Sequence, residues 1–402
     1  MTDHTALIQL AQRLLTESTG RSIKLKNPEK LNSQHIVLRC QLDPTSSDIS
    51  SVVLKQVTTT QFNNPDGPAD ESHRFLNEWA SLEFLSSLPG ENHYGPRLLA
   101  SNREDSLIIL EDFGAHETVQ DLLLGNNRDA TTTGMEAIGR FLGQMHAATY
   151  GRGDEFAAIQ SHRNAASPHS DSTRDIREQS EAFQNCFAAL QITPATGFWE
   201  ALENIERSIH SPGPFHTFIH ADAGPHNFLY IDGTVQLLDY EFGAYGHGLL
   251  DVVSARLGFP HTSKVQSVPL EAARQLERAY QRELAHVIPQ ITDNALFEQE
   301  IVDACAHWAL SRWVGYWTWY FKECFEIDEE AMNKKMEIST EEAQTMRSRT
   351  LTLYQSFIQF SQMTNHQLPI AETLQSYTRI LQQKWPELEV MPIYPGLRGN
   401  DT

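Results

Sequence analysis

The most informative part of this chain is His220-Ala-Asp-Ala-Gly-Pro-His-Asn227, with Leu237-Leu-Asp-Tyr-Glu241 soon after it. It sets Asp222 and Asn227 five residues apart, and a second aspartate, Asp239, follows an apolar run. The runs at 228–231 and 235–238 flank Asp232-Gly233, a pattern that predicts a β-hairpin. Such a hairpin would fold the chain back, so that Asp239 returns towards Asn227.

This set of side chains is the one that phosphoryl transfer from a nucleotide needs. One carboxylate accepts the proton of an attacking hydroxyl, while an amide and a second carboxylate hold magnesium against the phosphates. The residue types, their spacing and the intervening hairpin agree with that chemistry.

The same residues resemble a known family. HxDxxxxN, then an apolar strand and LDYE, is similar to the catalytic segment of the aminoglycoside phosphotransferase and choline kinase-like family. The resemblance implies a protein-kinase-like fold, Asp222 as the catalytic base, and Asn227 and Asp239 as magnesium ligands. Ala221 stands where the family commonly has glycine, and Tyr240 where Phe or Trp is frequent; neither position supplies a functional side chain.

Other interpretations of this stretch stay open. Asp and Asn favour turns and caps, so any one of these residues could be a local turn former. His220, Asp222 and His226 form an HxDxxxH string that could bind zinc in a metal-dependent hydrolase. A third alternative is a pseudokinase that holds ATP without turnover.

The N-terminal region has the pattern of a small β-rich lobe. An amphipathic helix is expected over 5–19, strands over 22–26, 35–42 and 51–57, and a helix over 71–87. The resemblance places the phosphate-binding strand lysine at Lys55. Its expected ion-pair partner is Glu78 on the following helix, because Phe75, Glu78, Leu82 and Leu85 match FxxExxxLxxL, and Glu83 is the alternative.

Two further segments are expected to contact the nucleotide. No GxGxxG precedes Lys55, so the loop over the phosphates would be the turn at 31–35, with Ser33 and Gln34 as contacts. Asp112-Phe113-Gly114 spells a protein-kinase metal tripeptide but precedes the catalytic segment. It is interpreted instead as the hinge, where backbone groups near Glu111 and Phe113 would bind the adenine edge.

Composition narrows the class of protein. The 402 residues can bury a large core, and the net charge of −21 argues against binding nucleic acid. No signal peptide and no stretch of about 20 apolar residues is evident, so no membrane partner is expected. The four cysteines form no CxxC pair, which fits a reducing cytoplasm.

The C-terminal region is expected to choose the substrate. The segment 307–320 is rich in Trp and Tyr, and two or three of these rings could line a pocket for a cation; core packing is the alternative. The acidic residues after it, Glu323, Glu326, Asp328, Glu329 and Glu330, could attract an amine or form a solvated face. Arg312 on the same helix leaves an acidic substrate open.

The sequence therefore predicts an α+β, bilobal, protein-kinase-like enzyme. Residues 1–113 would form an N-terminal nucleotide-binding lobe with an antiparallel sheet, and residues 114–402 a larger, mostly helical catalytic and substrate-binding lobe. The expected activity is a small-molecule kinase that uses ATP and Mg²⁺ to phosphorylate a substrate hydroxyl. The sequence does not indicate the substrate's identity or an oligomeric state.

Overall fold

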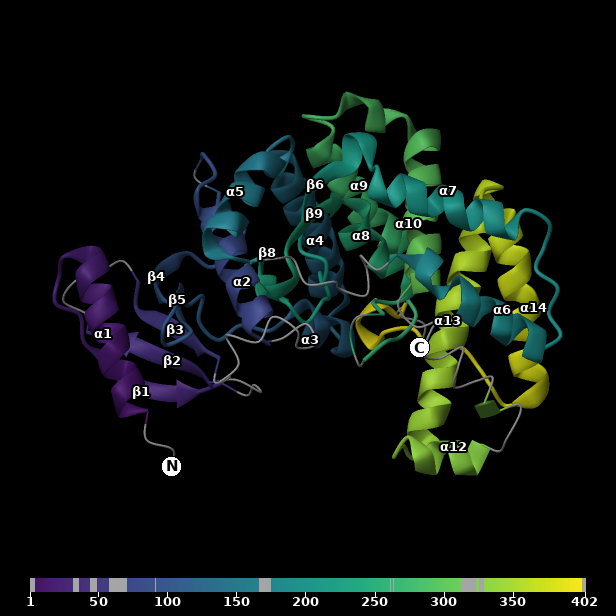
Figure 1. Ribbon diagram of the computed structural model, residues 1–402, viewed down its shortest axis with the longest axis horizontal. Coiled ribbons are helices and arrows are strands. Elements are labelled where there is room, and N and C mark those ends of the chain that lie inside the picture. Colours follow the sequence, from purple (N-terminus) through teal and green to yellow (C-terminus); the bar gives the residue numbers. More distant parts are fainter. Residues whose placement is uncertain are drawn as a thin grey trace. The chain divides into compact units, whose positions relative to one another are not determined.

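The computed structural model describes residues 4–31, 36–43, 49–57, 71–90, 92–165, 175–260, 262, 264–311, 323–324 and 329–399 (Figure 1). This part of the chain divides into two compact units. The first comprises Met1–His116, Arg152–Pro168 and Gln236–Ala244, and the second comprises Glu117–Gly151, His169–Val235 and Tyr245–Thr402.

The first unit combines a sheet with helices. Its elements are α1 (Thr5–Thr19), β1 (Leu25–Lys30), β2 (Ile36–Leu42), β3 (Ser51–Gln56), α2 (Glu71–Ser86), β4 (Leu98–Asn102), β5 (Leu107–Glu111), α5 (Gly153–Arg163) and the 3₁₀ turn η4 (Tyr240–Phe242).

The second unit is mostly helical. Its helices are α3 (Val119–Leu124), α4 (Arg128–Thr149), α6 (Ser180–Ala189), α7 (Phe198–His210), α8 (Leu249–Val252), α9 (Leu270–Leu284), α10 (Asn294–Ser311), α12 (Glu329–Lys335), α13 (Thr340–Thr364) and α14 (Leu368–Lys384). Short strands and 3₁₀ turns connect them: η2 (Ile176–Gln179), η3 (Gly213–Phe215), β6 (His216–Ile219), β7 (Phe228–Ile231), β8 (Thr234–Leu237), β9 (Ala244–His247), η5 (Val253–Leu257), η6 (Pro289–Thr292) and η7 (Pro395–Leu397).

The sheet of the first unit is antiparallel and has the order β1-β2-β3-β5-β4. Alternate residues of its central strands are buried, among them Leu38 and Cys40 on β2 and Val52 and Leu54 on β3. Side chains on a strand point to opposite faces in turn, so this alternation places one apolar face of each strand on the core. The strands predicted over 35–42 and 51–57 are present as β2 and β3, which pair with each other.

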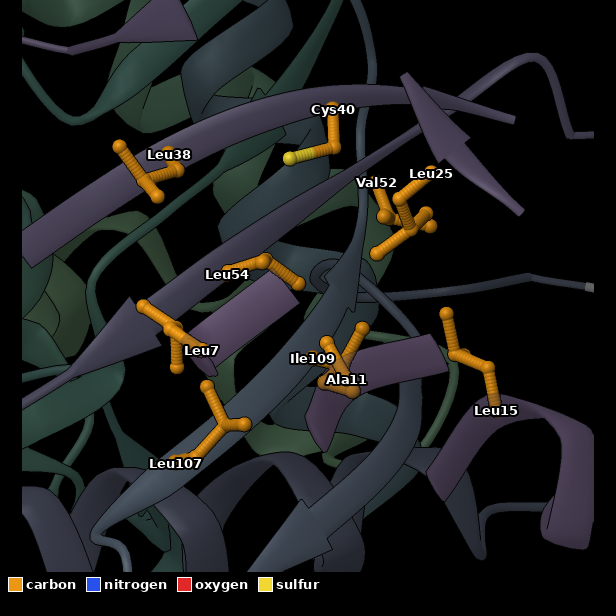
Figure 2. Close-up of a cluster of buried hydrophobic side chains, with 10 residues drawn as sticks. All are labelled: Leu7, Ala11, Leu15, Leu25, Leu38, Cys40, Val52, Leu54, Leu107 and Ile109. Carbon is orange, nitrogen blue, oxygen red and sulfur yellow. The ribbon is translucent and has the colours of Figure 1, made fainter. Parts of the chain in front are cut away.

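Helix α1 covers that apolar face. Leu7, Ala11 and Leu15 recur at intervals of four and are all buried, and they join the strand residues in one core cluster (Figure 2). Residues four apart lie on one side of a helix, so this single stripe faces the sheet. Gly20 ends the helix in the left-handed conformation that glycine adopts without strain. The predicted helix over 5–19 is confirmed with these bounds.

The first predicted strand was wrong in its bounds. The expected run 22–26 becomes β1 at Leu25–Lys30, which includes Pro28 and has an irregular register between Lys26 and Glu29. Proline cannot donate a hydrogen bond to a neighbouring strand. It is tolerated here because β1 is an edge strand of the sheet.

The predicted hairpin after the catalytic segment is present. Strands β7 and β8 form a two-stranded sheet. Asp232 and Gly233, which connect them, both have positive φ, 47° and 84°. Positive φ at both central residues matches the right-handed twist of a hairpin, and the Asp-Gly pair adopts it readily.

Helices α4 and α9 of the second unit pack closely. A Cβ added at Gly139 would lie 2.0 Å from the Leu276 carbonyl oxygen, and one at Gly143 would lie 2.7 Å from the Tyr280 oxygen. The two glycines are four residues apart and therefore lie on one side of α4. The absence of side chains there is what lets the backbones approach.

Gly139→Ala is therefore expected to destabilise the protein by about 1 to 3 kcal/mol, because the methyl group must push the α9 backbone away. The free energy of unfolding in urea measures the change. Gly134→Ala on the same helix is the matched control: its Cβ would meet only side chains, at 3.3 Å or more, and alanine favours a helix. Equal losses in both variants would contradict close packing at Gly139.

No helix among the described residues is long and apolar enough to cross a membrane.

Candidate active site

Lys55 on β3 is the centre of a charged cluster in the first unit. Its Nζ lies 2.6 Å from Glu78 Oε2 and 2.6 Å from Asp239 Oδ1. The Lys55 side chain is 14% exposed and that of Glu78 only 3%, so the lysine and this carboxylate meet away from bulk water. The pairing of Lys55 with Glu78 is the one that the sequence predicts, whereas the Asp239 contact was not anticipated.

Burial and charge compete at this cluster. Burial by itself lowers the pKa of Lys55, but the two carboxylates outweigh it, and the pKa lies above its ordinary value. Burial raises the pKa of Glu78, and Lys55 opposes that rise. Lys55 therefore stays a fixed positive charge inside a chain of net charge −21.

Glu83, the alternative partner, binds elsewhere. It lies on the same helix α2, and its Oε2 accepts a hydrogen bond of 2.7 Å from Nε of Arg163. The Arg163 guanidinium also lies over the Trp79 ring, 4.2 Å from its centroid. Glu83 therefore takes part in joining α2 to α5.

Asp239 is positioned by the chain around it. It has φ 66° and ψ 61° and immediately precedes η4. Asn77 on α2 donates to the carbonyl oxygens of Glu241 (3.0 Å) and Gly243 (2.9 Å), and Tyr240 is fully buried. Helix α2 thus holds the segment that carries Asp239 as well as supplying Glu78.

Asp222 and Asn227 lie in the second unit, on the loop between β6 and β7. The Asn227 side-chain amide donates to the Asp222 carbonyl oxygen at 3.0 Å, and the Gly224 N–H donates to the same oxygen at 2.7 Å. This use of the amide nitrogen points the amide oxygen of Asn227 away from the Asp222 main chain. The structure thus brings these two predicted residues together.

Asp251 fixes the start of this loop. Its carboxylate accepts hydrogen bonds from the N–H groups of His220 (2.7 Å) and Ala221 (2.8 Å). Ala221 has φ 63°, a left-handed conformation that favours glycine. The family's usual glycine suits this conformation, and the two bonds to Asp251 hold the alanine in it.

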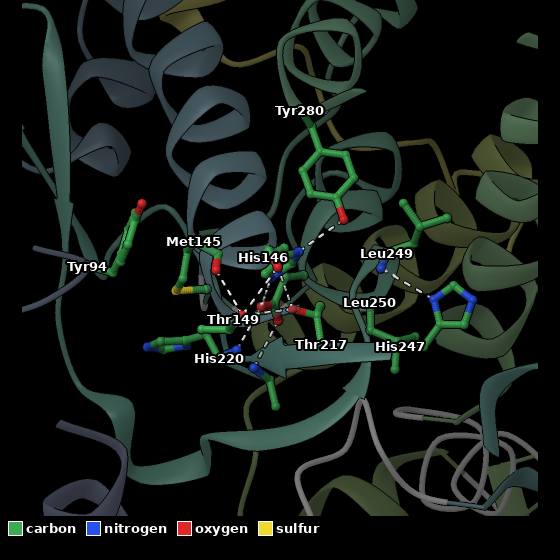
Figure 3. Close-up of polar contacts among 12 residues, drawn as sticks. Tyr94, Met145, His146, Thr149, Thr217, His220, His247, Leu249, Leu250 and Tyr280 are labelled. Carbon is green, nitrogen blue, oxygen red and sulfur yellow. Dashed lines mark hydrogen bonds and ion pairs between the residues drawn. The ribbon is translucent and has the colours of Figure 1, made fainter. Parts of the chain in front are cut away.

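Further residues support Asp251, among them His146, whose contact with Tyr280 is seen in Figure 3. His146 Nε2 lies 3.3 Å from Asp251 Oδ2, and His146 Nδ1 lies 3.0 Å from the Tyr280 hydroxyl. Thr217 on β6 donates to the His146 carbonyl oxygen at 2.8 Å. The series of side-chain contacts Tyr280–His146–Asp251 thus connects α9 and α4 to the loop. Its members lie far apart in the sequence, so no local sequence pattern indicates the series.

Asp112 has a structural role. Its carboxylate accepts hydrogen bonds from Arg39 Nε (2.8 Å), Arg39 Nη2 (3.2 Å), the Ser51 hydroxyl (2.6 Å) and the Gly114 N–H (3.0 Å). Burial opposes ionisation, but these bonds outweigh it, and the pKa of Asp112 is below its ordinary value. Arg39 Nη2 also donates to the Gly114 carbonyl oxygen at 3.0 Å. The Asp-Phe-Gly tripeptide is therefore anchored to the sheet.

Asp112→Asn is expected to lower the free energy of unfolding by about 1 to 3 kcal/mol, because the amide cannot accept all these bonds. The magnesium-dependent turnover that the resemblance predicts should be unchanged in the folded variant. In the wild type, the ionised Asp112 carboxylate contributes its full stabilisation of the folded state above about pH 4, the pKa of an unfolded aspartate. This stabilisation is lost as the pH falls through the lower pKa that Asp112 has in the folded state. Urea titrations at several pH values, with a magnesium titration of turnover, measure both; a shifted magnesium dependence would contradict the structural role.

Two of the remaining predicted nucleotide contacts, Glu111 and Phe113, lie in the described part of the chain. The Glu111 carboxylate pairs with Arg97, at 3.0 Å from Nε, and the Glu111 N–H donates to the Arg97 carbonyl oxygen at 2.9 Å. Phe113 follows β5 and is half-buried. Ser33 and Gln34 lie outside the described residues.

The zinc-hydrolase alternative needs His220, Asp222 and His226 to gather around one point. Among the residues that the structure describes, the one group of three or more potential metal ligands that forms is Asp175, Glu206 and His210. Instead, His220 Nδ1 accepts a hydrogen bond of 3.2 Å from the Asp222 N–H. The HxDxxxH string therefore does not form a metal site in this structure.

The structure describes residues 307–311 of the aromatic segment 307–320. Trp308 is 1% exposed and donates to the Leu250 carbonyl oxygen at 2.8 Å, so it packs in the core. From the acidic run, Glu329 pairs with Arg347 and accepts a hydrogen bond of 2.7 Å from Trp385. Residues 312–322 and 325–328 lie outside the described part of the chain.

A family model described as "Phosphotransferase enzyme family" matches residues 44–291, more than half of the chain. The chain belongs to this family. The family model confirms the predicted resemblance and the predicted enzyme class, a phosphotransferase. The antiparallel sheet of the first unit and the mostly helical second unit agree with the predicted α+β fold. No curated protein matches the chain closely enough to count as a relative.

Solved structures similar to this phosphotransferase share little sequence with it. A macrolide 2′-phosphotransferase from Brachybacterium faecium is 15% identical, with a TM-score of 0.44, over 82% of this chain and 95% of that chain. A choline kinase from Cryptosporidium parvum is 12% identical, with a TM-score of 0.47, over 92% of this chain and 99% of that chain. A choline kinase from Streptococcus pneumoniae is 12% identical, with a TM-score of 0.40, over 80% of this chain and 99% of that chain.

Proposed function

We propose that this phosphotransferase is an ATP- and Mg²⁺-dependent small-molecule kinase that transfers the γ-phosphate to a substrate hydroxyl. The observation that carries the proposal is Lys55, whose Nζ lies 2.6 Å from both Glu78 and Asp239. A buried lysine held by a helix carboxylate is the arrangement that kinases use to bind nucleotide phosphates.

Lys55 would bind the α- and β-phosphates, and Glu78 would fix its direction. A charged group in a dry environment interacts more strongly with a phosphate than an exposed one does. We propose Ser33 and Gln34 as further phosphate contacts. Main-chain groups near Glu111 and Phe113 would bind the adenine edge; the Glu111 N–H is engaged by Arg97, so Phe113 is the better candidate donor.

The proposed magnesium ligands fit the metal chemically. Asn227 would offer its amide oxygen, because its amide nitrogen donates a hydrogen bond to the Asp222 carbonyl oxygen. Asp239 would offer a carboxylate oxygen. Mg²⁺ prefers hard oxygen ligands of this kind and keeps several waters besides. Bound there, the metal would offset negative charge on the transferring phosphate.

Asp222 would act as the base. The half-buried carboxylate would orient the substrate hydroxyl and take its proton as the oxygen attacks phosphorus. Asp251 would keep the loop in place through the N–H groups of His220 and Ala221. We also propose that the two lobes divide near residue 113. A cytoplasmic location is proposed as well, because the four cysteines are buried free thiols.

An acceptor screen tests this function. The purified chain is incubated with ATP, Mg²⁺ and panels of aminoalcohols, aminoglycosides, neutral sugars and nucleosides. We expect acceptor-dependent release of ADP, together with a gain of one phosphate in the mass of a single acceptor class. Nucleotide binding without turnover on any panel member would favour the pseudokinase alternative, and tightly bound zinc with no nucleotide binding would favour a hydrolase.

A further inference from the structure

A second cluster of metal-ligating side chains lies in the second unit, apart from every residue assigned to phosphoryl transfer. Glu206 and His210 are four residues apart on α7, and Asp175 immediately precedes η2. Residues four apart lie on one side of a helix, so the carboxylate and the imidazole project together. One ligand atom from each of Asp175, Glu206 and His210 lies within 4.8 Å of the other two.

The separations match those around one small metal ion. His210 Nε2 lies 3.0 Å from Glu206 Oε2 and 3.8 Å from Asp175 Oδ2. Ligand atoms bound at about 2.0 to 2.1 Å to a tetrahedral zinc ion are roughly 3.3 Å apart from one another. The two distances from His210 Nε2, 3.0 and 3.8 Å, lie on either side of this value.

The buried carboxylate provides a second, independent observation. Glu206 is fully buried, and its Oε2 makes no well-aligned hydrogen bond with a described residue; His210 Nε2, 3.0 Å away, would be its ion-pair partner if protonated. The two atoms therefore converge on common space without a hydrogen bond between them. An unsatisfied buried carboxylate oxygen is costly, and a cation there would remove that cost.

Of the other groups around the cluster, His307 supports a metal site and Arg177 competes with one. Glu206 Oε1 lies 2.9 Å from Nδ1 of the buried His307, which would orient the carboxylate from behind. Arg177 Nε lies 3.0 Å from Asp175 Oδ1. Arg177 Nη2 also contacts Oδ2 at 2.5 Å, so this exposed side chain would have to shift to leave Oδ2 for the ion.

A cavity of about 350 Å³ adjoins the cluster, lined by Arg177, Glu203, Glu206, Arg207, His210 and Ser211. Three protein ligands beside an open space resemble sites where zinc keeps a fourth position for water or another ligand. The imidazole ligand favours zinc-class ions over Mg²⁺, which binds oxygen ligands.

We propose that Asp175, Glu206 and His210 form a binding site for one zinc-class divalent cation. The ion joins η2 to α7 and keeps one coordination position facing the cavity. This site is additional to the magnesium of the proposed kinase reaction and does not depend on it.

Zinc titration of the full chain, freed of metal and without nucleotide, tests the site. We expect one Zn²⁺ per chain to stay bound after dialysis against a large excess of Mg²⁺. His210→Ala and Asp175→Asn should each weaken zinc binding by about 100-fold or more, since loss of an outer contact alone costs roughly 10- to 100-fold. Co²⁺ in place of zinc should give the visible absorption of a tetrahedral site.

His286→Ala is the matched control, because His286 is an exposed histidine in the same unit that contacts the Glu283 carbonyl oxygen. It should bind zinc as the wild type does. Circular dichroism establishes that each variant is folded, and Asp175→Asn, at a position outside the helices, keeps the test informative if His210→Ala unfolds. Wild-type zinc affinity in both folded variants, or no zinc bound by the wild type, would overturn the proposal.

Discussion

Replacing Asp222 with Asn is expected to lower kcat by about 10² to 10⁴-fold, the usual effect of losing a general base. The amide has the same size as the carboxylate but cannot take the proton of the substrate hydroxyl. The loop should keep its conformation, because Asn227 and Gly224 contact the main-chain oxygen of Asp222 and Asp251 holds the preceding residues. Affinity for ATP should therefore change little.

Steady-state kinetics with the acceptor identified by the screen, and calorimetric titration with ATP, measure the two effects separately. Asp232→Asn is the matched control, since it makes the same change at a hairpin turn where Asn is readily accommodated. If Asp222→Asn turned over at the wild-type rate, Asp222 would not be the base.

Lys55→Ala is expected to reduce kcat/KM for ATP by about 10² to 10³-fold, comparable to the removal of a preorganised charge-stabilising group. Glu78→Ala should cost less, because Lys55 keeps its charge and its contact with Asp239 but loses one of the two groups that direct it. The double variant should be little worse than Lys55→Ala alone, since residues in contact are not additive.

Glu83→Ala provides the control on the same helix. Its carboxylate binds Arg163, so removing it should leave kcat/KM for ATP near the wild-type value. Thermal unfolding identifies variants that lose activity by losing structure, and Glu78→Gln keeps the buried shape if Glu78→Ala is unstable. Fully additive losses for Lys55 and Glu78 would show that the two residues act independently.

Features that depend on neighbouring residues along the chain could be predicted from the amino-acid sequence. Helix α1 follows from apolar residues at helical spacing and a terminal glycine, and the β7–β8 hairpin follows from Asp232-Gly233 between apolar runs. The spacing of Asp222, Asn227 and Asp239 indicated the phosphotransferase family, because chemistry restricts both residue type and separation. Lys55 and Glu78 could be paired in advance because a strand and the next helix carry them in a fixed pattern.

Contacts between groups far apart in the sequence depend on the three-dimensional fold and could not be predicted. Asp239 contacts Lys55 from 184 positions away, and Asp112 is held by Arg39, 73 positions earlier. Both contacts depend on strand pairing and helix packing, which bring side chains together without leaving a local pattern. The same holds for His146 behind Asp251 and for the approach of Asp175 to Glu206 and His210. Such contacts form because chain folding, not sequence spacing, sets the distance between residues on different elements.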